Sequence, residues 1–142
     1  MKILLINPSS ENIINSEVPR LIKQEVGIFP PLGIMYVASY LAKNFHHQIE
    51  ILDMLAKRLN YQQMQEYIQN YKPDILGITG HTHNLIDIVE IARISKAYNS
   101  NIHVTVGGSH ANAFPYETIQ IPQIDSVVAG EGEITFFELV DA

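Results

Sequence analysis

Five short strand-like runs, separated by helix-like segments, constrain the fold of this chain more than any other feature. The runs lie at residues 2–6, 47–53, 75–79, 102–106 and 124–129. Between them, apolar spacings of three and four predict helices from residue 32 onward and over residues 61–71, 84–98, 115–120 and 133–142. Strands that alternate with helices need crossover connections, and these produce a parallel sheet.

The number and order of these units predict a particular architecture. Five such units in 142 residues fit one domain of the flavodoxin-like, or Rossmann-like, α/β class. We expect a five-stranded parallel sheet in the order 2-1-3-4-5, with helices on both faces to make three layers. No internal repeat, low-complexity tract or interdomain linker interrupts the chain, so residues 1–142 are expected to form a single domain.

Composition argues against several classes of protein. The chain has no cysteine, which excludes disulfides, thiolate metal sites and iron–sulfur ligation by its own residues. Its 9 basic residues form no run and face 15 acidic ones, so we expect no nucleic-acid partner. No apolar stretch is long enough to cross a membrane, and "MKILLIN" turns polar too soon for a signal peptide. We therefore expect a cytoplasmic protein without a membrane partner.

Polar and glycine residues gather where the predicted strands end. Sheets of this kind bind ligands beyond the carboxyl ends of their strands. The residues at those ends are Asn7, Asp53, 79–82 ("TGHT"), 107–110 ("GGSH") and 130–133 ("GEGE"). Any one of these could be an ordinary turn or helix cap, but the set together favours a ligand site. The long connection 8–31 is typical of functional loops.

Three kinds of site could lie at these strand ends: a nucleotide site, a metal site and a phosphoacceptor site. "GEGEIT" lacks the third glycine of the dinucleotide motif, its glutamates repel phosphate, and the sequence contains no P-loop motif. We therefore do not expect nucleotide binding through either motif. His81, His83 and His110 could bind zinc, but no further ligand completes a known spacing, so we expect no metal. A phosphoacceptor receiver needs acidic residues at the end of the first strand and a lysine after the fourth. Here Asn7 ends the first strand and no lysine follows the fourth, so the sequence argues against phosphotransfer signalling.

Several stretches, taken together and in order, resemble one family. They are "PPLGIMYVASYLAKN" (30–44), "IEILD" (49–53), "PDILGITGHT" (73–82), "VTVGGSHANAFP" (104–115) and "IDSVVAGEGEITFFELV" (124–140). They resemble the N-terminal cobalamin-binding domain of B12-dependent radical SAM proteins, over nearly the whole chain. The resemblance implies a Rossmann-like domain that holds cobalamin over its carboxyl strand ends, with the nucleotide tail entering between strands and helices.

The resemblance also implies a set of cofactor-binding residues and no catalytic ones. Glycines at 107 and 108 leave room for the tail, so we expect Gly108→Val to lose cobalamin while the fold is preserved. Ser109 and His110 are expected near the corrin edge. Pro31, Leu32 and Gly33 are expected to cover the corrin plane. Thr79, His81 and Thr82 are expected to line the neighbouring wall. Gly130, Glu131 and Gly132 are expected to close the far side.

Two departures from the wider family limit what this chain does alone. The better-known B12 domains, those of methionine synthase and the mutases, carry D-x-H-x-x-G after the second strand, but here Leu55 replaces the histidine and Arg58 the glycine. The radical SAM branch commonly lacks that histidine. This implies base-off cobalamin with no protein histidine as lower ligand. The cysteine motif of a radical SAM barrel is also absent, so the 4Fe-4S cluster and S-adenosylmethionine would belong to a parent domain, in cis or in trans.

The leading hypothesis is therefore a cobalamin-binding module, not a complete catalyst, whose parent performs methyl transfer or a rearrangement. One alternative is a flavodoxin-like regulatory or interaction domain without a cofactor, in which the glycine turns are structural. Another is a small enzyme that uses His81 or His110 as an acid–base group, although no nucleophile and base are paired in the sequence. Retention of hydroxocobalamin distinguishes the first hypothesis from the others.

Overall fold

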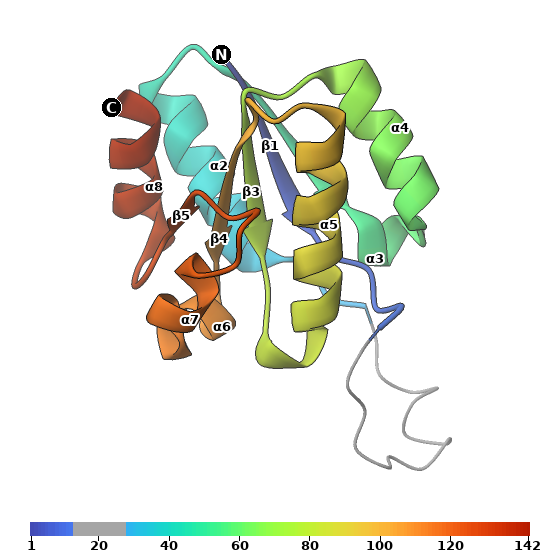
Figure 1. Ribbon diagram of the computed structural model, residues 1–142. Coiled ribbons are helices and arrows are strands. Elements are labelled where there is room, and N and C mark those ends of the chain that lie inside the picture. Colours follow the sequence, from blue (N-terminus) through green and yellow to red (C-terminus); the bar gives the residue numbers. More distant parts are fainter. Residues whose placement is uncertain (13–27) are drawn as a thin grey trace.

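The computed structural model describes residues 1–12 and 28–142. Its centre is a five-stranded parallel sheet with strand order β2-β1-β3-β4-β5 (Figure 1), which confirms the predicted fold class and order. The strands are β1 (Lys2–Asn7), β2 (Gln48–Asp53), β3 (Ile75–Thr79), β4 (His103–Gly107) and β5 (Ser126–Val127). Of the long connection 8–31, residues 13–27 lie outside the described residues.

Helices cover both faces of the sheet and make three layers (Figure 1). The helical segments are α2 (Leu32–Asn44), α3 (Met54–Lys57), α4 (Tyr61–Tyr71), the 3₁₀-helix η1 (Thr82–Asn84), α5 (Leu85–Tyr98), α6 (Ser109–Ala113), α7 (Pro115–Ile119) and α8 (Gly132–Asp141). Successive strand residues point to opposite faces, so Leu4 and Ile6 pack in the cluster with α4 and α5. Ile3 and Leu5 pack in the cluster with α2 and α8.

The structure differs from the sequence-based expectation in its short elements. The predicted strand 124–129 pairs with β4 only at Ser126 and Val127, although β2, the other edge strand, pairs with β1 over its full length. The helices α3, α6 and η1 were not expected, since elements of three to five residues show too little of a 3.6-residue period. All three lie at the carboxyl edge of the sheet, where they shape the site.

The turn after β2 is fixed by hydrogen bonds to Asp53 and by a left-handed residue at its end. Asp53 Oδ1 accepts hydrogen bonds from Asn7 Nδ2 at 2.9 Å and from Ala56 N at 3.0 Å, and so caps α3. Arg58, in the place of the glycine, ends α3 with φ +52°, the left-handed conformation that glycine favours. Leu55 is thereby held on a short helix beside the carboxyl end of β1.

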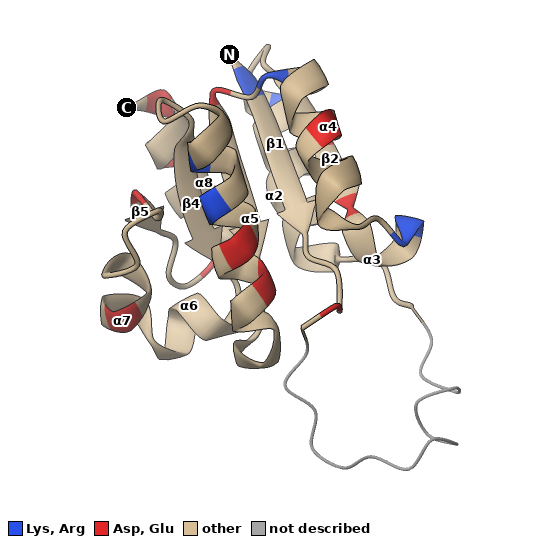
Figure 2. Cartoon of the chain, turned by 45° about the vertical axis from the view of Figure 1, so that its right-hand side comes forward, with Lys and Arg blue, Asp and Glu red and all other residues tan. Residues whose placement is uncertain are grey.

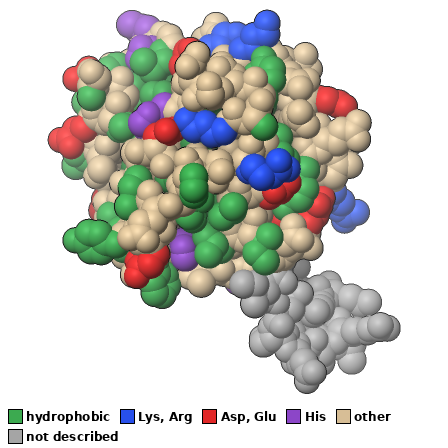
Figure 3. All heavy atoms as spheres, in the orientation of Figure 1, with side chains coloured by type: hydrophobic (Ala, Val, Ile, Leu, Met, Phe, Trp, Pro, Cys, Tyr) green, Lys and Arg blue, Asp and Glu red, His purple; other side chains and the backbone are tan. Residues whose placement is uncertain are grey.

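Charged and apolar side chains are distributed differently over the surface. Lys and Arg residues are scattered over separate elements of the described chain (Figure 2). Exposed apolar side chains gather over α6 and α7, at the lower left of Figure 3, where Tyr116 is 79% exposed and Phe114 44%. A further exposed pair, Phe29 and Leu32, precedes and opens α2. In the described part of the chain no helix is both long and apolar enough to cross a bilayer.

Candidate functional site

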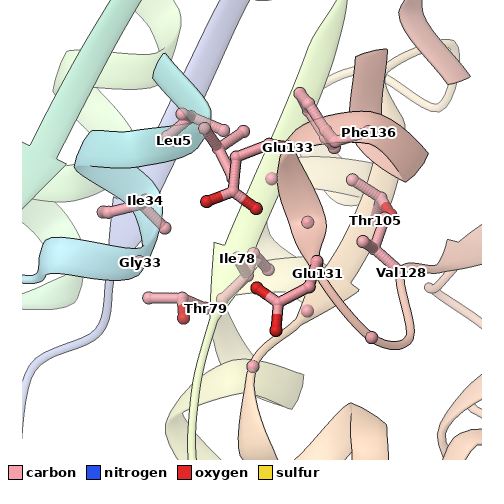
Figure 4. A pocket seen from close by; sticks show the side chains of 16 residues that line it. Leu5, Gly33, Ile34, Ile78, Thr79, Thr105, Val128, Glu131, Glu133 and Phe136 are labelled. Carbon is pink, nitrogen blue, oxygen red and sulfur yellow. The ribbon is translucent and has the colours of Figure 1, made fainter. Parts of the chain in front are cut away.

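A cavity of about 190 Å³ opens between α2, α8 and the sheet (Figure 4); we call it the α2–α8 cavity. Its floor is made by β3 and β4, whose register pairs Gly77 with Thr105 and Thr79 with Gly107. On the same face β1 carries Leu5. Gly77 lets Leu5 and Phe136 pack closely against the sheet, because a Cβ there would lie 2.7 Å from Leu5 Cδ2 and 3.4 Å from the Phe136 ring.

A second, larger hollow of about 530 Å³ lies over the carboxyl ends of β1 and β3; we call it the upper groove. Its walls come from residues 7–10, residues 29–34 and the connection that follows β3, with Leu55 of α3 between them. Gly33, Ile34, Thr79 and Gly108 line both hollows. The two hollows therefore adjoin, and one extended ligand can enter both.

Each hollow contains a buried hydroxyl without a partner. Among the described residues, the buried side-chain polar atoms that lack a hydrogen bond are Thr105 Oγ1 and Ser9 Oγ. Thr105 lines the α2–α8 cavity and Ser9 lines the upper groove. An unpaired buried hydroxyl costs roughly 1–3 kcal/mol, so each hydroxyl would gain from a polar partner that enters its hollow.

The glycines of the site have different physical reasons. A Cβ at Gly33, in the first turn of α2, would meet nothing within 4 Å, and one at Gly107 would make only ordinary contacts of 3.7 Å. Gly108 has φ +94°, and its Cβ would lie 2.7 Å from the carbonyl oxygen of Gly80. Protein packing alone requires glycine at 108, so Gly108→Val strains the fold itself and does not give the clean test expected from the sequence.

The polar residues that follow β3 and β4 form two hydrogen-bonded pairs. His81 Nδ1 lies 2.5 Å from Ser109 Oγ, and Thr82 Oγ1 lies 3.1 Å from Nδ1 of the buried His110. The His81 ring also stacks on that of His83, with centroids 5.2 Å apart. These pairs join the turn after β3 to the start of α6, so they fix His81 at the rim of the upper groove.

The structure divides the sequence-predicted site residues into three groups. Gly107, Gly130, Glu131 and Gly132 line the α2–α8 cavity, and Pro31, Leu32 and His81 line the upper groove. Gly33, Thr79 and Gly108 line both. Thr82, Ser109 and His110 line neither and stand behind His81.

Sequence reasoning missed several residues of the site. Leu5, Thr105 and Phe136 line the α2–α8 cavity, and Ser9 lines the upper groove. Thr105 had a usable indication, because it is the polar residue inside the apolar run "VTV". The others become site residues only through the packing of α2, α3 and α8 against the sheet.

The turn between β5 and α8 is held from a neighbouring element. Gly130 adopts φ +81°, and its N–H donates to Asn112 Oδ1 on α6 at 2.6 Å. A Cβ at Gly132 would lie 3.1 Å from Val37 Cγ2, so α8 begins in close contact with α2. These two constraints fix the positions of Glu131 and Glu133 at the cavity.

The perturbed tyrosines lie away from both hollows. Burial and the nearby Glu50 raise the pKa of Tyr67 to about 12, and burial with Glu50 and Asp74 raises the pKa of Tyr71 to about 12. Both residues belong to α4, which covers the opposite face of the sheet. Within residues 1–12 and 28–142, no three His, Asp or Glu side chains come together as metal ligands.

The buried carboxylate of Asp87 fixes the segment that leaves the upper groove. It accepts hydrogen bonds from Asn12 N at 3.3 Å, from Asn12 Nδ2 at 3.1 Å and from the Tyr61 hydroxyl. Burial and this carboxylate raise the pKa of Tyr61 above its usual range. Residues 9 and 10, which wall the groove, are thereby held between β1 and the Asn12 contact.

The fold and the paired hollows define a class: a doubly wound α/β domain with two adjoining hollows at the carboxyl strand ends, where sheets of this kind bind ligands. The particular family follows from comparison with known proteins. The model of the B12 binding domain family matches residues 21–140, so the chain belongs to that family. This confirms the resemblance found in the sequence to cobalamin-binding domains.

Named relatives include enzymes. An uncharacterised methyltransferase of Pyrococcus horikoshii is 42% identical over 144 residues, which cover 100% of this chain and 29% of the relative. An anaerobic magnesium-protoporphyrin IX monomethyl ester cyclase of Rubrivivax gelatinosus is 32% identical over 82% of this chain and 21% of its own length. A cytidylyl-2-hydroxyethylphosphonate methyltransferase of Streptomyces wedmorensis is 28% identical over 95% of this chain and 27% of its length. The chain thus spans less than a third of these relatives.

A solved structure shares the fold. A LuxR-family DNA-binding response regulator of Staphylococcus aureus superposes with a TM-score of 0.55 over 97% of this chain and 92% of its own, at 15% identity. At this identity the likeness concerns the fold alone. Asn7 ends β1 here, at the position where a phosphoacceptor receiver needs acidic residues, and the nearby Asp53 caps α3.

Proposed function

We propose that this domain holds cobalamin with the nucleotide tail in the α2–α8 cavity and the corrin ring over the upper groove. The observation that carries the proposal is Thr105, whose unpaired hydroxyl lies in the α2–α8 cavity. An apolar cavity of ~150 Å³ is enough to bind benzene, so about 190 Å³ accommodates much of a bicyclic base. Gly33 leaves open space where the two hollows meet.

The rim of the upper groove suits a broad, largely apolar ring. Leu32 is 61% exposed and Phe29 75% exposed, and both line this groove together with Pro31. Apolar surface of this extent gains free energy when a macrocycle covers it. His81 supplies a hydrogen-bonding group at the same rim, and Ser109 positions its ring.

Leu55 carries the proposal that cobalamin binds base-off, without a protein imidazole below the cobalt. It takes the place of the family's ligand histidine and lines the upper groove. An isobutyl side chain cannot coordinate a metal. The groove also holds His81 and His83, so substitution of each histidine tests whether an imidazole reaches the cobalt.

We further propose that the domain serves a radical SAM domain, in cis or in trans, that carries the 4Fe-4S cluster and S-adenosylmethionine. When bound, cobalamin would supply a cobalt centre suited to methyl-transfer chemistry. This chain's own residues bind and orient the cofactor and exclude water from its lower face. Relatives named as methyltransferases and as a cyclase support methyl transfer or ring closure as the reaction of the parent.

The proposal is tested by mixing the purified domain with hydroxocobalamin, removing free ligand and recording the visible spectrum. We expect stoichiometric corrin with a base-off spectrum. Absence of retained corrin at high micromolar protein would favour a regulatory domain without a cofactor.

The lower ligand is tested by His81→Ala and His83→Ala. We expect the spectrum of bound cobalamin to be unchanged in both variants, although His81→Ala weakens retention. A shift from an imidazole-ligated to a base-off spectrum in either variant would identify that histidine as the lower ligand and contradict the role given to Leu55.

A further inference from the structure

Two carboxylates line the α2–α8 cavity where α8 begins. Glu131 is exposed and Glu133 half-buried. In Figure 4 both carboxylates turn toward the space between α2 and α8. The ion pairs of the described residues involve other carboxylates, and no Lys, Arg or His of that part of the chain lines this cavity. Both carboxylates are therefore free to meet a ligand.

Thr105 gives an independent indication that a polar ligand enters the same cavity. It is 1% exposed, and its Oγ1 has no partner within the described residues. Val104 and Val106 pack in the cluster with α4 and α5, so the alternation of β4 turns Thr105 to the opposite face, where it lines the cavity. A ligand here meets a hydroxyl on the cavity floor and two carboxylates where α8 begins.

The chemistry of the carboxylates selects which part of a nucleotide tail faces them. An ionised carboxylate accepts hydrogen bonds and donates none, so its partner has to be a donor. The tail of cobalamin offers ribose hydroxyls as donors, whereas its phosphate is repelled by like charge. Acidic side chains bind ribose hydroxyls in other doubly wound folds.

Building on the proposed function, we propose that Glu131 and Glu133 accept hydrogen bonds from the ribose hydroxyls of the nucleotide tail. The domain then selects a corrinoid with a complete tail over one without it. The tail's phosphate lies away from α8, toward the upper groove, where His81 and Ser9 supply neutral or positive polar groups.

The test compares two probes, hydroxocobalamin and hydroxocobinamide, which lacks the nucleotide, by equilibrium dialysis with absorbance detection. For Glu133→Ala and for the double variant with Glu131→Ala, we expect the dissociation constant for hydroxocobalamin to rise about tenfold or more. The constant for hydroxocobinamide should stay unchanged. Glu133→Gln, which keeps an acceptor, should recover part of the loss. Glu138→Ala, an exposed residue of α8 outside the cavity, is the matched control.

Each other outcome overturns the inference. An equal loss for both probes would place the effect on the corrin or on the fold, which thermal unfolding of each variant distinguishes. Tighter cobalamin binding by the alanine variants would show that the carboxylates face the phosphate. If the wild-type domain bound both probes with equal affinity, the nucleotide tail would contribute nothing to binding, although the proposed cobalamin binding would stand. Binding of neither probe would refute the proposed function as well.

Discussion

At the scale of single residues, the site separates glycines that look alike in the sequence. Gly108 is required by its positive φ and by the backbone of Gly80 against it. Gly33 is required by neither, because its φ is ordinary and the space beyond it is open. A helix position where alanine would fit and would stabilise the protein, yet glycine is present, indicates that something else occupies the space.

Gly33→Ala tests this interpretation. The free energy of unfolding should stay the same or rise by up to about 1 kcal/mol, because alanine is the better helix residue. Retention of hydroxocobalamin should fall, because the new methyl group projects into both hollows. Chemical denaturation and equilibrium dialysis measure the two effects, with Ser39→Ala on the exposed side of α2 as control. Unchanged retention would show that no ligand passes Gly33.

Thr105→Val removes the buried hydroxyl while keeping the shape of the side chain. Because Oγ1 has no partner within the described residues, we expect the variant to be as stable as the wild type or more stable, by about 1 kcal/mol. The affinity for cobalamin should fall several-fold with the loss of one neutral hydrogen bond. A variant that loses stability and keeps its affinity would mean that the hydroxyl serves the fold.

At the scale of elements, the sequence predicted what is long and periodic and missed what is short. Four of the five strands and the helices α2, α4, α5, α7 and α8 lie within one or two residues of their expected bounds. The exceptions, α3, η1, α6 and the truncated β5, have two to five residues each, too few to show a local period. The α2–α8 cavity was also beyond sequence reasoning, because it requires knowing that Gly77 and Thr105 are neighbours.

A clamp at the amino end of the sheet gives the elements a measurable pH dependence. Asp125 Oδ2, just before β5, lies 2.6 Å from Lys96 Nζ of α5 and accepts from Val104 N of β4 at 2.7 Å. Burial alone would raise the pKa of Asp125, but the hydrogen bonds from Lys96 and Val104 outweigh it and hold the pKa below its usual 3.8. The clamp therefore favours the folded state above pH 3.8 and loses this effect as the pH falls through the lower folded pKa.

Asp125→Asn should lower the free energy of unfolding at pH 7 by about 1 kcal/mol or less, because the carboxylate is partly exposed and screened. The difference from wild type should shrink as the pH falls below 3.8. Urea denaturation across this range measures it, with the exposed Asp141→Asn as control. A difference that does not change with pH would show that the carboxylate charge contributes nothing.

At the scale of the whole molecule, the two hollows adjoin at the carboxyl end of the sheet, and the α2–α8 cavity extends from there over one face. The other face, covered by α4 and α5, is filled by a continuous apolar cluster. This asymmetry suits the proposed binding of a cofactor, because the well-packed α4 and α5 face stabilises the fold while the α2–α8 cavity stays accessible to a ligand. The relatives' greater length fits the proposal that catalysis lies in another domain, to which this end is presented.

The proposed binding of cobalamin in the two hollows is tested most directly by amide ¹H–¹⁵N correlation spectra of the 142-residue domain, recorded with and without hydroxocobalamin. We predict that the amides that shift belong to the walls of the α2–α8 cavity and the upper groove, with Gly33, Thr105 and Gly130 among the largest changes. Amides of α4 and α5 that face away from the site should not move. Shifts confined to the α4 and α5 face, or none at saturating ligand, would contradict the account.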